Sequence, residues 1–382
     1  MKYKILFFIV CAMTLLSAQE SRGCTSAIIS AEMNPYGRPI LWKHRDTSTI
    51  DNKVEFVKTN PEEYSYVALF NAGDKELKEA WMGMNEAGFA IMNTASYNIK
   101  DDNVAEKDMD KEGLVMTLAL RQCRSVDDFA NLLDTIRKPM GVEANFGVID
   151  ATGAGAYFET NNHSYNRFDL KDAGNGVLVR TNYSHSGRKN EGYGFVREAN
   201  ACHLLEPYVN SRSITPEVLT EELSRVFYHD GKHKDFTLNH PARVLDEDFI
   251  PRYKSTATVA IEGCRPVADL SLVTPEFVKD EYVMWTGLGY PPCSEVRGVV
   301  CSEDGVDDDL RGSLPNGHSP LADKAKRERD RIFTSSKNGK NKYVNIDALY
   351  NKEGTGYTQK IKEVNSGNYS KIRAKRDLNG NR

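Results

Sequence analysis

The chain has 382 residues, of which 40% are hydrophobic and 27% are charged, so it can bury a substantial core and is not disordered in bulk. Its formal net charge of -4 at pH 7 gives no support to a nucleic-acid partner. Beyond the amino-terminal segment no apolar run is long enough for a membrane span, so we expect none.

The amino terminus has the three-part pattern of an export signal. Two lysines supply a positive start, residues 5–16 form a nearly unbroken apolar run, and residues 17–23 are polar. The apolar run is too short to span a bilayer. A cut after Gly23 would make Cys24 the first residue of the mature chain. We therefore predict a signal peptide over residues 1–23 and an exported protein, periplasmic or secreted.

Two alternatives for this segment stay open. A cut after Ala18 would leave residues 19–23 as a short propeptide, which Cys24 would remove itself. A lipoprotein would also begin with a cysteine after its signal and would be anchored at Cys24. Glu20 and Arg22 place charge where a lipidation signal is uncharged, so the lipid anchor is the less favoured alternative.

The first part of the mature chain reads as strands separated by short turns. Two β-prone runs flank the Pro/Gly turn at residues 34–37, which predicts a hairpin that ends at the charged cluster 43–46. A second hairpin is predicted around the turn at residues 85–88. The strand candidates are residues 25–30, 39–42, 64–71, 80–83 and 89–92.

Helices and strands follow in alternating groups. Residues 114–123 and 125–137 have the apolar spacing of helices, and Ser125 followed by two aspartates is typical of a helix start. The order of strands, helices, strands, helix and strands favours an α+β domain whose sheets carry helices on their outer faces. The other candidates are strands over residues 146–149, 155–158, 176–180, 256–261 and 281–285, and a helix over 214–228.

The last stretch changes character at about residue 319. The sequence becomes basic, and a peripheral helix carries five Lys and Arg residues between positions 324 and 331. The remainder is polar with little apolar periodicity, so we expect a loosely ordered tail rather than a binding arm. The mature chain thus divides into one domain over residues 24–318 and a basic, partly helical extension over residues 319–382.

Removal of the signal would leave six cysteines. Cys293 and Cys301 are close in sequence and flanked by loop residues, so an oxidising compartment could join them in a disulfide. Buried free cysteines are the alternative.

Cys24 has its own chemistry if it becomes the terminus. A thiol with a pKa of about 8.5 is only partly ionised at neutral pH, whereas an α-amine with a pKa of about 7.7–8 is a well-matched base. Both groups belong to the same residue, so the amine can accept the thiol proton directly or through water. A terminal cysteine is therefore sufficient to begin amide chemistry.

Several stretches in order resemble the N-terminal nucleophile hydrolases. The nearest branch is the linear-amide C–N hydrolases: choloylglycine (bile salt) hydrolases, penicillin V acylases and acyl-CoA:6-aminopenicillanate acyltransferase-like peptidases. The resemblance implies a four-layer αββα sandwich, with two stacked sheets between helical layers. The stretches are residues 24–26, 37–46, 83–88, 180–182, 255–258 and 284–289.

The resemblance also implies roles for residues of this chain. Cys24 would be the nucleophile, and Asp46, at the end of the second strand, would hold and orient its ammonium form. Asn182 and, with a shifted alignment, Asn93 would donate to the oxyanion. The alternative for both asparagines is a turn residue bonded to its own backbone.

Two positions depart from the bile salt hydrolases. An arginine three residues before the aspartate is replaced by Lys43, which keeps the charge but loses planar bidentate reach. The arginine after the Ser-rich strand motif is missing, and Arg252 is the nearest substitute. Both differences put bile salt specificity in doubt and leave the reaction type unchanged.

We therefore predict an exported cysteine amidohydrolase that acts on a small acylated amine and requires no cofactor or metal. An acyltransferase that passes the acyl group to an amine is the close alternative. A non-catalytic surface lipoprotein is the alternative from a different class. Homo-oligomers are common among the relatives that the chain resembles, while the substrate and the oligomeric state stay open.

Overall fold

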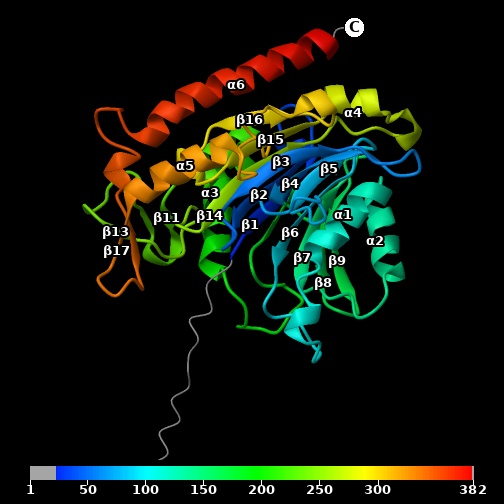
Figure 1. Cartoon of the computed structure of the whole chain (residues 1–382), viewed down its shortest axis with the longest axis horizontal. Helices are drawn as coiled ribbons and strands as arrows, with labels where there is room; N and C mark the ends of the chain where they lie inside the picture. Colours follow the sequence, from blue (N-terminus) through cyan, green and yellow to red (C-terminus); the bar gives the residue numbers. More distant parts are fainter. Residues whose placement is uncertain (1–22, 381–382) are drawn as a thin grey trace, which may run out of the picture.

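The computed structural model describes residues 23–380 (Figure 1). The predicted signal peptide and the alternative propeptide and lipid signal lie, apart from Gly23, outside the described residues. Within residues 23–380 no helix is both long and apolar enough to cross a membrane.

Two antiparallel sheets form the centre of the molecule (Figure 1). The six-stranded sheet consists, in spatial order, of β10 (Val177–Arg180), β1 (Thr25–Ile29), β2 (Ile40–Asp46), β14 (Ser255–Glu262), β15 (Val283–Leu288) and β16 (Val296–Val299). The seven-stranded sheet follows chain order: β3 (Asn52–Val57), β4 (Tyr66–Asn71), β5 (Met82–Asn85), β6 (Ala90–Ala95), β7 (Ala144–Ile149), β8 (Gly155–Thr160) and β9 (Tyr165–Asp169).

Helices and short strands complete the fold. The α-helices are α1 (Glu112–Gln122), α2 (Val126–Thr135), α3 (Phe195–Ser211), α4 (Pro275–Glu281), α5 (Pro320–Ile332) and α6 (Tyr357–Gly380). A π-helical turn, η4, spans Val218–Leu223. Two small sheets contain β11 (Tyr228–His229) with β12 (Lys234–Asp235), and β13 (Val244–Leu245) with β18 (Lys342–Val344) and β17 (Phe333–Ser335).

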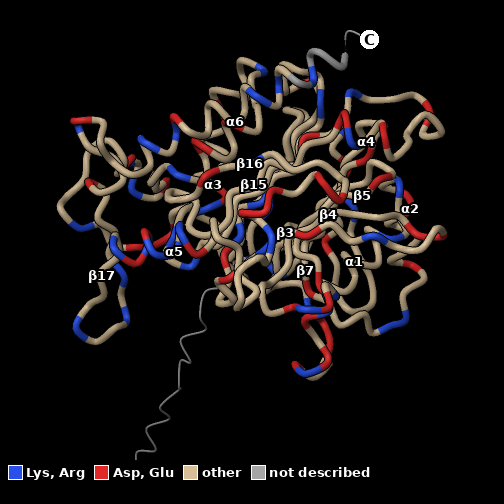
Figure 2. Tube along the Cα trace, turned by 45° about the horizontal axis from the view of Figure 1, so that its top comes forward, with Lys and Arg blue, Asp and Glu red and all other residues tan. Residues whose placement is uncertain are grey.

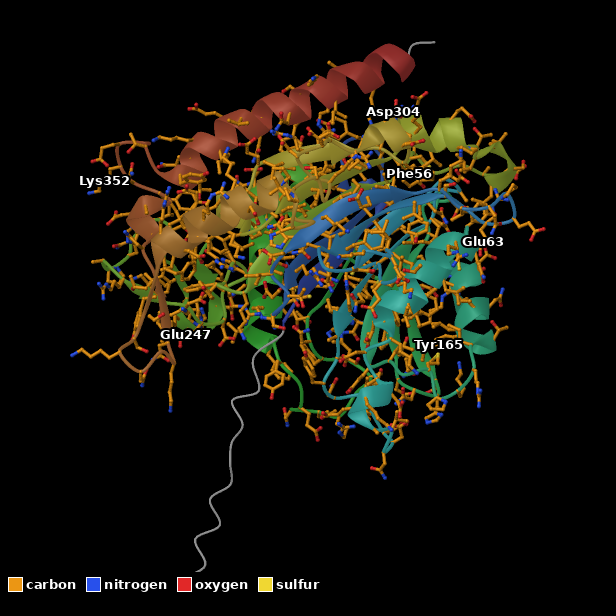
Figure 3. The ribbon with its side chains drawn as sticks, in the orientation of Figure 1. Phe56, Glu63, Tyr165, Glu247, Asp304 and Lys352 are labelled. Atoms are coloured by element: carbon orange, nitrogen blue, oxygen red, sulfur yellow. The ribbon has the colours of Figure 1, made fainter. Side chains whose placement is uncertain are left out.

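Three layers of apolar side chains hold the sandwich together. Between the sheets, Leu41 and Val259 of one sheet share a core with Leu69 of the other, and Phe56, labelled in Figure 3, packs against its rim. A second core joins the outer face of the seven-stranded sheet to α1 and α2. A third joins the outer face of the six-stranded sheet to α3, η4 and α6. The predicted α+β sandwich of four layers is therefore confirmed.

The predicted start of the second helix is also confirmed. The Ser125 side chain accepts a hydrogen bond from the backbone of Asp128 at 3.0 Å, and the Asp128 carboxylate accepts one from the backbone of Ser125 at 3.0 Å. This reciprocal pair satisfies two donors that a helix start leaves open, so α2 begins at Val126.

Two helical segments differ from the sequence prediction. The helix α3 was not expected, since Pro207 lies inside it and its apolar residues are sparse. The predicted helix over residues 214–228 is instead the short π turn η4, followed by β11 at its end.

The expectation of a loosely ordered tail was wrong. The helix α6 runs across the six-stranded sheet (Figure 1), where Tyr369 packs on Trp285 with ring centroids 4.7 Å apart. Arg376 donates to the buried carboxylate of Glu262 at 2.5 Å. Polar pairs of this kind leave no apolar periodicity in the sequence, because each depends on a partner from another segment.

The charge of the extension is balanced in the fold. Figure 2 shows Lys and Arg interspersed with Asp and Glu along α5. Lys324 pairs with Glu295 at 2.6 Å and Lys326 with Asp51 at 3.1 Å. The basic helix thus docks on acidic residues of the sandwich.

The predicted disulfide was also wrong. Cys293 and Cys301 are both free and buried. Cys293 belongs to an apolar cluster near α5, whereas Cys301 belongs to the core between the sheets, and β16 separates them in sequence. The alternative of buried free cysteines therefore holds for this pair.

Candidate active site

Cys24 lies directly before β1 and is held by the pairing of β1 with β2. Thr25 stands opposite His44 in this antiparallel pair, so the start of β1 meets the end of β2. The Cys24 thiol faces the backbone carbonyl of Asp46 with an Sγ–O distance of 3.8 Å, and the residue is only 9% exposed. The local hairpin predicted from the sequence thus brings the predicted nucleophile beside the predicted acid.

Asp46 is buried and fully engaged. Its Oδ2 accepts from Arg252 Nε at 3.1 Å and also from Arg252 Nη2, and its Oδ1 accepts from Ser255 Oγ at 2.6 Å. Burial opposes the charge of Arg252, but the Asp46 carboxylate outweighs it and holds the pKa of Arg252 above its ordinary value. The structure therefore places Asp46 and Arg252 in one ion pair.

This ion pair sits at the Gly23–Cys24 bond. Arg252 Nη2 donates to the carbonyl oxygen of Gly23 at 2.8 Å. A Cβ at position 23 would lie 2.6 Å from that nitrogen and 2.7 Å from Nη2 of Arg197. The residue before Cys24 is therefore packed against two guanidinium groups.

Arg197 of α3 is the part of the site that the sequence did not reveal. Its Nη1 donates to the Cys24 carbonyl oxygen at 2.5 Å and to Thr25 Oγ1 at 3.2 Å. Its Nη2 donates to Asn182 Oδ1 at 2.8 Å. Burial, together with the neighbouring Arg252, lowers the pKa of Arg197 to about 10, so the group is still charged at neutral pH.

Asn182 follows β10 and is oriented by these contacts. Since Oδ1 faces the guanidinium of Arg197, Nδ2 must face the other way, where it donates to the Ala95 carbonyl at 2.8 Å. Asn182 also pairs with Tyr193 through an isolated antiparallel bridge. A primary amide has two N–H donors, so the second donor of Nδ2 is the one that could meet an oxyanion.

Lys43 and Asn93 form a second group that links the two sheets. Lys43 Nζ of β2 donates to Asn93 Oδ1 of β6 at 2.8 Å and to the carbonyl of Trp81 at 2.9 Å. Burial lowers the pKa of Lys43 to about 8, against the opposing effect of nearby Cys24. The Asn93 amide is thereby fixed with its oxygen toward the lysine and its nitrogen away from it.

His44 is linked to the acid through Ser255. Its Nε2 lies 2.8 Å from Ser255 Oγ, which in turn donates to Asp46. Burial lowers the pKa of His44 to about 4, so the imidazole is neutral at pH 7. The sequence marks Ser255 only as part of the stretch 255–258. The structure adds its contact with the Asp46 carboxylate.

One cluster elsewhere has metal-ligand residue types: Asp51, His318 and Asp323. His318 Nδ1 lies 2.9 Å from Asp323, and its Nε2 lies 3.6 Å from Asp51. Both ring nitrogens already face a carboxylate, and Asp51 also forms a salt bridge with Lys326. The arrangement is that of a histidine bridging two acids.

Comparison with known proteins assigns the chain to a family. The family model for acyl-coenzyme A:6-aminopenicillanic acid acyl-transferase matches residues 36–229, which is half of the chain. The chain belongs to this family. The resemblance to N-terminal nucleophile hydrolases is thereby confirmed, and the protein is an enzyme of the amide hydrolase and acyltransferase class. No curated protein matches the chain.

Solved structures with a similar fold include amidases. An N-acylethanolamine-hydrolyzing acid amidase ortholog from Caenorhabditis elegans is 13% identical with a TM-score of 0.42, over 66% of this chain and 97% of that one. A variant of the conjugated bile acid hydrolase from Clostridium perfringens is 12% identical with a TM-score of 0.44, over 74% and 95%. Penicillin V acylase from Agrobacterium tumefaciens is 12% identical with a TM-score of 0.39, over 72% and 86%.

Proposed function

We propose that this protein is an exported cysteine amidohydrolase in which Cys24, once it is the amino terminus, cleaves a linear amide. The observation that carries the proposal is the surroundings of the Gly23–Cys24 bond: Arg252, which is paired with Asp46, donates to the Gly23 carbonyl, and Arg197 holds the Cys24 carbonyl. Groups so placed would fix the backbone of a terminal cysteine while leaving its thiol and amine free to react.

The first step is attack by sulfur. The α-amine of Cys24 takes the thiol proton, and the thiolate forms a bond to the carbonyl carbon of the substrate. The carbonyl oxygen becomes an oxyanion, for which the second N–H of Asn182 Nδ2 is a candidate donor, with the Asn93 amide as a further candidate. In this proposal the negative charge of Asp46 favours the ammonium form of the terminus.

The second step releases the amine and then the acid. The α-ammonium returns its proton to the leaving nitrogen as the C–N bond breaks, which leaves an acyl-thioester on Cys24. Water, deprotonated by the α-amine, attacks the thioester, and the carboxylic acid departs. The catalytic cycle ends with the Cys24 thiol restored and needs no oxidant or cofactor.

Acyl transfer is the second candidate, and the matched family is the observation that favours it, since the family is described as an acyl-transferase. If an amine replaces water at the thioester, the same residues make a new amide. Product analysis in the presence of an added acceptor amine distinguishes the two outcomes.

The experiment that tests the nucleophile compares two cysteine variants. The mature protein is incubated with a panel of N-acyl amines, and amine release is measured. We expect Cys24→Ser to lose nearly all turnover while its circular dichroism stays that of the folded protein. Cys264→Ser is the matched control, because its thiol donates to the Ala151 carbonyl and to the Tyr282 hydroxyl, contacts that a serine hydroxyl can replace. Retained turnover by Cys24→Ser would exclude this cysteine as the nucleophile.

A further inference from the structure

A cavity of about 780 Å³ lies beside α3. Its apolar wall runs along the edge strand β10 and the facing side of α3, and none of the residues placed in the active site above lines it. The volume is within the range of about 300–1,000 Å³ that is usual for small-molecule sites. The apolar lining consists of Phe168, Val177, Leu178, Val179, Leu205 and Val209.

The edge of β10 is closed to an added strand. The Val177 N–H donates to the Asn175 side chain at 3.1 Å, and the Val179 carbonyl accepts from Arg180 Nη1 at 2.8 Å. Side chains of the strand's own segment therefore occupy backbone groups that an incoming peptide strand would need. A small molecule fits this cavity better than an extended peptide.

The charges of the lining select the sign of the ligand. Three carboxylates line the cavity: Glu198, Glu206 and Asp230. Arg180 is its only lysine or arginine, and that guanidinium is already paired with Glu159 at 2.7 Å. Two histidines, His185 and His203, also line the cavity, and His185 faces Glu198 at 2.9 Å. An anion would still meet an excess of carboxylates, whereas a cation would meet complementary charge.

Glu198 supplies a specific acceptor. Its Oε1 lies 2.9 Å from His185 Nε2, and its Oε2 is buried. The Tyr183 hydroxyl also interacts with this carboxylate, and burial, the Glu198 charge and that contact together raise the pKa of the phenol. Neither neighbour is a lysine or an arginine, so an ammonium group would supply the charged donor that this buried carboxylate lacks.

We propose that this cavity binds an organic cation, an ammonium group on an apolar chain. The ammonium bonds Glu198 Oε2, and the chain lies along the valines of β10 and α3. The proposed reaction releases an amine, so this class of ligand would be present wherever the enzyme works. That link rests on the proposed function, whereas the binding itself does not.

The test uses Cys24→Ser protein, in which turnover does not interfere, and n-hexylammonium chloride as the probe in calorimetric titration. We expect hexylammonium to bind at least ten-fold more tightly than hexanol, and hexanoate not to bind. Glu198→Gln should weaken hexylammonium at least ten-fold, whereas the control Glu276→Gln, on the exposed side of α4, should not. Equal binding of hexylammonium and hexanol, or an unchanged affinity in Glu198→Gln, overturns the proposal.

A second measurement does not depend on the folding of a Glu198 variant. Cys202 lines the cavity and is the exposed cysteine of the described chain, whereas the others are buried. Hexylammonium should slow maleimide labelling of Cys202 at concentrations that saturate the calorimetric signal. Labelling at an unchanged rate would place the bound amine elsewhere and would refute this site. Failure of either measurement leaves the amidase assay of Cys24 untouched.

Discussion

Arg197 holds three acceptors of the candidate site with a single guanidinium group. The planar fork of arginine can reach the Cys24 carbonyl, Thr25 Oγ1 and Asn182 Oδ1 at once, because its donors point in fixed and different directions. It thereby fixes both the backbone of the nucleophile and the direction of the Asn182 amide. Its guanidinium donates to groups of the protein itself, so we describe Arg197 as a positioning residue.

The positioning role predicts a defect in kcat rather than in binding. Arg197→Lys keeps the charge, but one ammonium on a flexible stem cannot span the three acceptors. Since a misplacement of about 1 Å can cost about 100-fold in rate, we expect kcat to fall about 100-fold with KM within a few-fold of the wild type. Steady-state kinetics on the best amide of the panel measures both.

The control for this variant is Arg188→Lys, whose guanidinium pairs with Glu191 at 2.6 Å on the surface. Its kcat should equal that of the wild type. If the loss of kcat in Arg197→Lys were fully explained by a lower melting temperature, Arg197 would have a structural role and no positioning role.

Lys43 predicts a pH dependence of stability. Burial lowers its pKa from 10.5 to about 8, so between these values the unfolded chain holds a proton that the native protein lacks. Native stability therefore rises with pH across this window. Compared with Lys43→Met, the wild type should gain about 1.4 kcal/mol in free energy of unfolding per pH unit between pH 8 and about 10.

Urea unfolding of both proteins at several pH values measures this difference. The control is Lys352→Met, at an exposed position labelled in Figure 3, for which the difference should stay constant. A constant difference for Lys43→Met as well would mean that Lys43 titrates alike in the folded and unfolded states.

At the scale of elements, the sequence predicts the helices and hairpins whose determining residues are close together in the chain. The helix α2 has its cap in the adjacent residues Ser125 and Asp128, and the β1–β2 hairpin has its turn between the two strands, so both were predictable. The hairpin alone explains why Cys24 and Asp46 meet. These features depend on neighbours within about 20 residues, which a single sequence displays.

Two helices depend on distant partners and were missed. The helix α3 contributes Arg197, whose acceptors lie 15 to 173 residues away in the sequence. The helix α6 is held by contacts such as Arg376 with Glu262, across 114 residues. Both helices also place apolar side chains in the core on the outer face of the six-stranded sheet, but the polar partners named here come from distant segments and leave no pattern in the local sequence. The contact between Lys43 and Asn93, which joins two sheets, was hidden for the same reason.

At the scale of the whole molecule, the sandwich places the proposed nucleophile where three of its layers meet. Cys24 directly precedes β1 of one sheet, Asn93 belongs to the other sheet, and Arg197 comes from the covering layer on the outer face. Three of the four layers must therefore be assembled before the candidate site is complete. The proposed mechanism adds a second condition, since Cys24 would become active only as an amino terminus and the bond before it would first have to be cut.

This second condition predicts the mass of the mature protein. When the full chain is expressed with its own amino-terminal segment, we expect the exported product to begin at an unmodified Cys24. A diacylglycerol adduct in the intact mass would instead support the lipid anchor. A chain that kept residues before Cys24 and still cleaved amides would contradict the mechanism.

Gly23 should be required for that maturation. A side chain at this position would push against the guanidinium groups of Arg252 and Arg197, and against Asn182 Oδ1 at 3.0 Å, all of which are buried and bonded. We expect Gly23→Val to accumulate uncut precursor, seen by intact mass, and to lack amidase activity. Gly174→Val is the control, because a Cβ there meets nothing within 4 Å. Normal processing of Gly23→Val would show that the bond is cut before the chain folds around it, by a peptidase that acts on the unfolded segment.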